Sequence, residues 1–236
     1  MTHPLHRSTR TFGRISFLIA ALLASFSLAA ESSGNSDNPK GVIPTTNLTL
    51  DMNPESEVIT VSNAGSGRIT VNSSISGSQT FDAPLITLTL NALGGNDTIN
   101  LISLPAGMAP TFLVVNGGDG NDELTTDFTG GDPVPLGGLT FNGDGQTGSP
   151  GDSLVVKGVF TNQLLDYTNA HDGSIFVDSN PINYTGLEPI TGGNSSHTTL
   201  NLPDGVRNEA SLRNHATTGF IEIFPDSGTF ETTALP

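Results

Sequence analysis

Three aspartates, Asp97, Asp122 and Asp152, each end a glycine-containing stretch of the chain, and their carboxylates could bind a hard cation. Ca²⁺ takes six to eight oxygen ligands, which come from carboxylates, backbone carbonyls and water. Glycine leaves the carbonyls of a turn free of side-chain obstruction. Carboxylates that follow glycine-rich turns therefore predict Ca²⁺ coordination at those turns.

The elements that must position these aspartates are short strands that recur at a nearly fixed interval. Leu88–Asn91, Leu113–Asn116 and Leu139–Asn142 each end on Asn, at spacings of 25 and then 26 residues. Such a period indicates stacked supersecondary units. We expect an all-β fold, specifically a parallel β-helix or β-solenoid with three coils of about 25 residues, in which Asn91, Asn116 and Asn142 form a ladder.

The alternation of side chains within these strands predicts a continuous core. Six apolar residues face one way: Leu88, Leu90, Leu113, Val115, Leu139 and Phe141. The residues between them face the other way, as in any strand of period two. An Ig-like β-sandwich is the alternative, and antiparallel pairing of Leu113–Asn116 with Asp122–Phe128 around a glycine-rich hairpin at Gly117–Asn121 would indicate it.

The second coil contains a complete nonapeptide motif. Gly-Gly-Asp-Gly-Asn-Asp-Glu-Leu-Thr, at 117–125, fits the pattern G-G-x-G-x-D-x-U-x at every defined position. The chain thus resembles the hemolysin-type, or RTX, calcium repeat of exported bacterial proteins. The resemblance implies that Ca²⁺ is held between adjacent turns by backbone carbonyls and an aspartate.

The other two coils depart from this pattern. The first keeps only Gly95-Asn96-Asp97, and in the third, four extra residues separate Gly143-Asp144-Gly145 from Gly151-Asp152. Transferred position by position, the resemblance and the aligned aspartates give eight candidate metal ligands: Asp97, Gly117, Gly118, Asp119, Gly120, Asp122, Asp144 and Asp152.

Charge and composition restrict the partners. The formal net charge is −15, with 28 Gly and no Cys. Three of the eight basic residues, Arg7, Arg10 and Arg14, precede an apolar run at 15–28 that ends in small residues, which is the pattern of a secretory signal peptide. Cleavage after Ala29 or Ala30 would leave a charge of −18, so nucleic acid and anionic lipid are poor partners. No later segment is apolar and long enough to span a membrane.

The expected organisation is a signal peptide at 1–30, a flexible linker at 31–46, the three-coil module at 47–190 and an incomplete second copy of that module at 191–236. The second copy is inferred from matches at an offset of 152, including Leu48 with Leu200 and Ile69 with Ile221. Gly186-Leu187-Glu188-Pro189-Ile190 resembles a segment of large bacterial surface repeat proteins. There we expect Glu188 to mark a turn before Pro189 or, alternatively, to supply a ligand at a second site.

Catalysis is disfavoured. Polysaccharide lyases and hydrolases occur among parallel β-helices, but no basic residue lies in the coil turns, and His171, His197 and His215 are expected in surface loops without metal-ligand spacing. The sequence therefore predicts a secreted or cell-surface, calcium-binding structural or adhesion protein, with cell-surface polysaccharide or further copies of itself as partners. A metal-independent module that binds carbohydrate or protein is the alternative.

Overall fold

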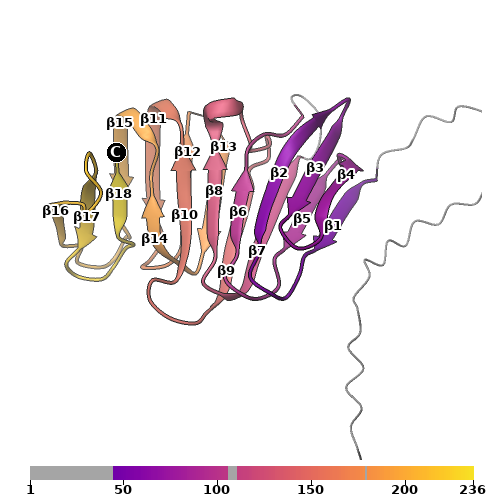
Figure 1. Cartoon of the computed structure of the whole chain (residues 1–236). Helices are drawn as coiled ribbons and strands as arrows, with labels where there is room; N and C mark the ends of the chain where they lie inside the picture. Colours follow the sequence, from indigo (N-terminus) through magenta and orange to yellow (C-terminus); the bar gives the residue numbers. More distant parts are fainter. Residues whose placement is uncertain (1–44, 106–110, 179) are drawn as a thin grey trace, which may run out of the picture. The chain divides into compact units, whose positions relative to one another are not determined.

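The chain passes repeatedly between two mixed β-sheets, whose strands lie side by side in Figure 1. The computed structural model describes residues 45–105, 111–178 and 180–236, and these belong to one compact unit. The all-β prediction is confirmed, because the only helical element among these residues is a single 3₁₀ turn, η1 (Phe128–Gly130). The predicted signal peptide and the first 14 residues of the predicted linker lie outside the described residues.

Sheet A contains eight strands. In spatial order they are β1 (Asn47–Asp51), β5 (Thr87–Asn91), β7 (Phe112–Gly120), β9 (Leu139–Gln146), β13 (Asn180–Thr185), β12 (Gly173–Val177), β11 (Val159–Tyr167) and β15 (Asn194–Asn201). The first five of these pair in parallel, as do β11 and β15, while β12 runs antiparallel to both of its neighbours.

Sheet B contains ten strands. In spatial order they are β16 (Ala210–Asn214), β17 (Ile221–Pro225), β18 (Thr233–Leu235), β14 (Leu187–Thr191), β10 (Asp152–Lys157), β8 (Glu123–Asp127), β6 (Thr98–Leu101), β2 (Val58–Gly65), β3 (Arg68–Ser73) and β4 (Gly77–Asp82). Its central strands, from β18 to β2, pair in parallel, and an antiparallel element extends each end.

The predicted 25-residue interval appears as strand register in sheet A. Leu88 pairs with Leu113, and Leu113 pairs with Leu139. The antiparallel hairpin between Leu113–Asn116 and Asp122–Phe128 is absent, because β7 belongs to sheet A and β8 to sheet B. From β5 to β10 the chain therefore alternates between the sheets, and β7 to β10 each pair with the strand that lies two places earlier in the chain.

The predicted core is confirmed. All six apolar residues expected to face inward from β5, β7 and β9 have exposed fractions of 1% or less. Ile99, Leu124 and Leu154 of sheet B are fully buried. Burial of a side chain of this size stabilises a fold by about 1.5–3 kcal/mol relative to exposure, so these aligned rows supply much of the driving force for stacking.

The glycine-rich segments are predicted to be turns, but those of the second and third coils begin as continuations of strands β7 and β9. Strand β7 continues through Gly120 and β9 through Gln146, because Gly118, Asp119 and Gly120 pair in parallel with the equivalent residues of the third coil. An isolated bridge also links Gly94 to Asp119. The glycine segments of the three coils are thus stacked, and the backbone of one coil lies directly against that of the next.

Residues 186–190 also differ from expectation. Glu188 and Pro189 lie inside strand β14, so the predicted turn at this position is wrong. Histidines 171 and 215 follow strand ends, but His197 lies within β15 and not in a loop. In residues 191–236, β15 and β18 pair with β11 and β14, which joins this segment to both sheets. Its origin as a second copy stays a prediction.

No helix among the described residues is long and apolar enough to cross a membrane.

Stacking of the glycine segments predicts a severe effect of a small side chain at Gly118. This residue has φ +97°, and an added Cβ would lie 2.2 Å from the carbonyl oxygen of Leu93 in the neighbouring coil. We expect Gly118→Ala to lower the free energy of unfolding by about 2–4 kcal/mol, measured by chemical denaturation. Gly148→Ala is the matched control, since nothing lies within 4 Å of its added Cβ. Equal effects of the two substitutions would contradict the stacked arrangement.

Candidate functional site

Asp97, Asp122 and Asp152 stand one above another at the start of β6, β8 and β10, and we call them the acidic column. The Oδ1 atom of Asp122 accepts a hydrogen bond of 2.8 Å from the backbone N–H of Asp97. The Oδ1 atom of Asp152 accepts one of 2.7 Å from the N–H of Asp122. At the end of the column, the N–H of Glu57 donates to Asp97 at 2.8 Å. Each aspartate thus caps a backbone donor of the preceding coil.

The second carboxylate oxygen of each aspartate in the column has no such partner. The exposed fractions of the three residues are 1% or less. Their Oδ2 atoms are buried and form no hydrogen bond with the described residues. A buried, unpartnered carboxylate oxygen is costly, because it has lost its hydration without compensation. A proton, a water molecule or a cation would relieve this cost.

We call these unpartnered Oδ2 atoms the orphan oxygens, and two of them explain why glycine occupies positions 117 and 143. An added Cβ on Gly117 would lie 2.5 Å from Oδ2 of Asp122, and one on Gly143 would lie 2.5 Å from Oδ2 of Asp152. The carbonyl oxygens of Gly143 and Gly186, respectively, would lie 2.9 Å from the same points. The orphan oxygens of Asp122 and Asp152 therefore each face a glycine Cα near a carbonyl oxygen of the next coil.

The other predicted ligands lie at the same edge of the stack. Asp119 and Asp144 are exposed and sit in neighbouring coils, where Gly118 pairs with Asp144. Oδ1 of Asp119 would lie 2.7 Å from a Cβ on Gly145. Gly120 faces the first coil, since its added Cβ would lie 1.8 Å from the carbonyl oxygen of Gly95. The structure thus brings the predicted residues of three coils to one edge, which we call the acidic edge.

The predicted asparagine ladder is confirmed, and its three residues lie in β5, β7 and β9 of sheet A. Nδ2 of Asn116 donates to Oδ1 of Asn91 at 2.7 Å, and Nδ2 of Asn142 donates to Oδ1 of Asn116 at 2.7 Å. The ladder continues beyond the three coils, because Nδ2 of Asn91 donates to Asp51 and Thr185 donates to Oδ1 of Asn142. Every rung therefore supplies one donor and one acceptor, which fixes the register of the strands.

A second group of ligand-type side chains was only partly anticipated from the sequence. One ligand atom from each of His171, Glu188 and Glu231 can be chosen so that all three lie within 4.8 Å of one another. Burial raises the pKa of Glu231 to about 8, and the charge of Glu188 adds to this effect. Because 17 and 43 residues separate these positions, no local motif could reveal the group.

Comparison with known protein families, with curated proteins and with solved structures found no match for this chain.

Burial also raises the pKa values of the acidic column. The pKa of Asp97 rises to about 7 and that of Asp152 to about 6, mainly through desolvation, with the neighbouring aspartates contributing in the same direction. The pKa of Asp122 is raised for the same principal reason, and Asp144 adds to it. Hydrogen bonds from the backbone oppose these shifts without cancelling them.

These shifts predict that the metal-free protein is more stable at pH 5 than at pH 8. A carboxyl whose pKa is higher in the folded than in the unfolded state contributes stability that is complete below its ordinary pKa. That stability is lost as pH rises through about 6 to 7 for this column, and through about 8 for Glu231. We expect the thermal midpoint to fall by several degrees between pH 5 and pH 8 in the presence of chelator, measured by far-UV circular dichroism.

The control is the double variant Asp97→Asn and Asp152→Asn, which keeps the Oδ1 acceptors but removes two ionisable groups. Its midpoint should vary less with pH. The surface pair of Lys157 with Asp127, at 2.7 Å, does not interfere, because it lowers the pKa of Asp127 to about 2. A midpoint that rises from pH 5 to pH 8 would contradict the assignment.

Proposed function

We propose that this chain is an exported structural protein whose coils form a β-solenoid and whose acidic edge binds Ca²⁺. The β-solenoid interpretation is supported by the alternation of the chain between two sheets and by the parallel register of β5, β7 and β9. Pairing of β6, β8 and β10 repeats the same order in the other sheet. Each coil thus contributes one strand to each sheet.

The observation that carries the calcium proposal is the set of orphan carboxylate oxygens in the acidic column. Oxygen-only surroundings suit Ca²⁺, which binds carboxylates and backbone carbonyls. Asp119 and Asp144 supply further carboxylates at the same edge. Of the basic residues in the described chain, Lys157, Arg207 and Arg213 each pair with an acidic residue outside this edge. A cation from solution would therefore balance this concentration of negative charge.

Calcium and protons compete for the column in this proposal. When the aspartates are protonated they carry no charge, so a bound cation would add little stability. When they are ionised, Ca²⁺ replaces the missing compensation and stabilises the folded state by mass action. Calcium outside the cell would thus order the edge, while the core alone holds the strands together.

No catalytic role is assigned, and the proposed activity is structural or adhesive at the bacterial cell surface. The residues at 1–30 are proposed to be removed on export. The expected adhesive partners remain cell-surface polysaccharide or further copies of the chain.

A second candidate function, carbohydrate binding without metal, is favoured by a depression on sheet A. The depression has a volume of about 500 Å³ and is lined by polar side chains together with one aromatic ring. Asn162, His197 and Asn201 offer hydrogen bonds, and Phe176 offers an apolar face. Such a combination suits a sugar, and binding that persists in chelator would support this candidate over the first.

Calcium binding is tested by the thermal midpoint at pH 7.5 in chelator, in CaCl₂ and in MgCl₂. For a dissociation constant of about 10⁻⁴ to 10⁻³ M, typical of extracellular modules, 10 mM Ca²⁺ stabilises by roughly 1.4–2.7 kcal/mol. The midpoint should therefore rise by roughly 3–10 °C, and chelator should reverse the rise. The effect should shrink at pH 5, where protons occupy the column.

Asp122→Asn should abolish most of this rise, because it removes the central carboxylate charge while keeping the Oδ1 acceptor. Asp204→Asn is the matched control, since Asp204 is an exposed acidic residue in a turn outside the acidic edge. No response to Ca²⁺, an equal response to Mg²⁺, or an unchanged response of Asp122→Asn would remove calcium from the proposal.

Export is tested by expressing the full chain in a bacterial host and determining the N-terminus of the exported protein by mass spectrometry. We expect the mature chain to begin at Ala30 or Glu31. Leu18→Arg, which places a charge in the apolar run at 15–28, should keep the protein in the cytoplasm with its N-terminus uncleaved. Export of this variant at the normal level would show that the run is not a signal peptide.

A further inference from the structure

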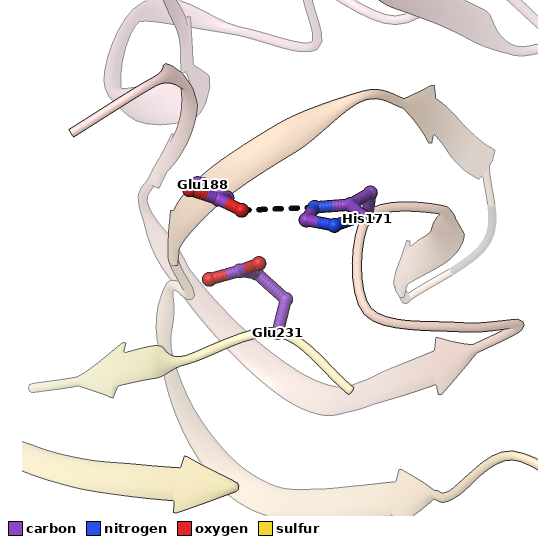
Figure 2. Close-up of side chains that lie close together, drawn as sticks. All are labelled: His171, Glu188 and Glu231. Carbon is purple, nitrogen blue, oxygen red and sulfur yellow. Dashed lines mark ion pairs between the residues drawn. The ribbon is translucent and has the colours of Figure 1, made fainter. Parts of the chain in front are cut away.

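Three side chains from separate parts of the sequence face one another beside strand β14 (Figure 2). His171 projects from the turn between β11 and β12, Glu188 from β14, and Glu231 from the segment before β18. Nδ1 of His171 lies 3.1 Å from Oε1 of Glu188. The group differs from the acidic edge in its ligand types, because it contains an imidazole nitrogen as well as carboxylate oxygens.

The backbone holds each member of the group in place. The carbonyl oxygen of His171 accepts a hydrogen bond of 3.0 Å from the N–H of Leu187, the neighbour of Glu188. Oδ1 of Asn169 accepts from the N–H of His171 at 2.8 Å and so closes the turn. The N–H of Ile190 donates to the carbonyl of Thr232 at 3.1 Å, which aligns Glu231 with β14. These bonds therefore fix the backbone segments that carry the three side chains relative to one another.

Glu231 is the most buried member of the group. Its exposed fraction is 6%. Oε1 accepts a hydrogen bond of 2.8 Å from the N–H of Thr232, but Oε2 accepts none from the described residues. No lysine or arginine of the described chain forms an ion pair with Glu188 or Glu231. Only Glu188 forms an ion pair with His171 among the described residues, and the carboxylate of Glu231 points toward this pair (Figure 2).

A cavity of about 300 Å³ gives access to Glu188 and Glu231, two of the three members of the group. Glu188 and Glu231 are part of its lining, together with His215 and Glu222. Solvent and a small ion can therefore reach the two carboxylates. The space also admits the water ligand that completes the coordination of a metal held by three protein ligands.

We propose that His171, Glu188 and Glu231 form a binding site for a first-row divalent cation, for which Zn²⁺ is the natural probe. Zinc binds His nitrogen and carboxylate oxygen at about 2.0–2.2 Å in a tetrahedral arrangement, so two of its ligand atoms lie about 3.3–3.6 Å apart. The ligand atoms here lie within 4.8 Å of one another, and small side-chain rotations bring them into range. The imidazole favours zinc-like metals over Ca²⁺, which prefers oxygen ligands.

The site joins the C-terminal strands to the rest of the sheet. Strand β18 pairs with β14 through only two residue pairs, Ile190 with Thr233 and Thr191 with Ala234. Strands β16 and β17 attach to sheet B only through β18. A metal bound to His171 and Glu188 on one side and to Glu231 on the other would add a third link beside these two residue pairs. Its consequence is a more tightly held C-terminal segment at 210–235.

The test is zinc binding by the purified, metal-stripped protein, followed by isothermal titration calorimetry and by the visible spectrum of the Co²⁺ form. We expect one equivalent of Zn²⁺ to bind, and millimolar Ca²⁺ to leave the affinity unchanged within twofold. His171→Gln and Glu231→Gln should each weaken binding at least tenfold, since even outer-shell changes cost 10–100-fold in affinity. Hydrogen exchange at 190–191 and 233–235 should slow on adding Zn²⁺.

Two controls separate this proposal from misfolding and from the calcium proposal. His197→Gln removes an exposed imidazole on β15 and should bind zinc normally. Asp122→Asn should lose its calcium response but keep its zinc affinity. Glu231→Gln should fold, because it removes a buried charge without changing the size of the side chain. Absence of zinc binding, unchanged affinity of His171→Gln, or displacement of zinc by Ca²⁺ would overturn the proposal.

Discussion

The hydrogen bond from one aspartate's backbone N–H to the carboxylate of the next aspartate is the constraint on which this structure depends. Asp97 donates to Asp122, and Asp122 donates to Asp152. The bond satisfies a backbone donor where the chain leaves one sheet for the other, and it ties adjacent coils together. It also buries a carboxylate, whose second oxygen is left without a partner. The same buried carboxylates therefore both join adjacent coils and leave an oxygen that a proton or cation could neutralise.

Other features of the edge follow from this bond. Glycine at 117 and 143 leaves room for the second carboxylate oxygen, and glycine at 118 and 120 lets adjacent backbones approach. The asparagine ladder performs the complementary task without charge, since an amide offers both a donor and an acceptor. The asparagine rungs are thus uncharged and satisfy one another, whereas the acidic column carries ionisable groups whose second oxygens have no partner in the described residues.

The sequence predicts those features that repeat locally. The interval between Asn91, Asn116 and Asn142 was sufficient to predict their ladder and the apolar rows of the core, because equal spacing in the chain becomes register in a stack. Extension of β7 through Gly120 was not predicted, because glycine and asparagine ordinarily indicate turns. In this protein, pairing with the neighbouring coil overrides that local preference.

The group of His171, Glu188 and Glu231 illustrates what a repeat pattern cannot show. These residues belong to the antiparallel part of sheet A, to β14 and to the C-terminal segment, where the regular interval has ended. Proximity to Pro189 predicts a turn at Glu188, yet Glu188 lies in β14 of sheet B, at the irregularity in its pairing with β10.

The two proposed metal sites differ in the ligands that the chain offers, and that difference determines which ion each selects. The acidic edge offers carboxylate and carbonyl oxygens from several coils, so the proposed binding of Ca²⁺ would depend on the register of those coils. The second group presents an imidazole and two carboxylates within one small volume, so its affinity depends on a short ladder of two residue pairs. Because an imidazole nitrogen favours zinc-like ions over Ca²⁺, the two proposed sites would not compete for the same ion.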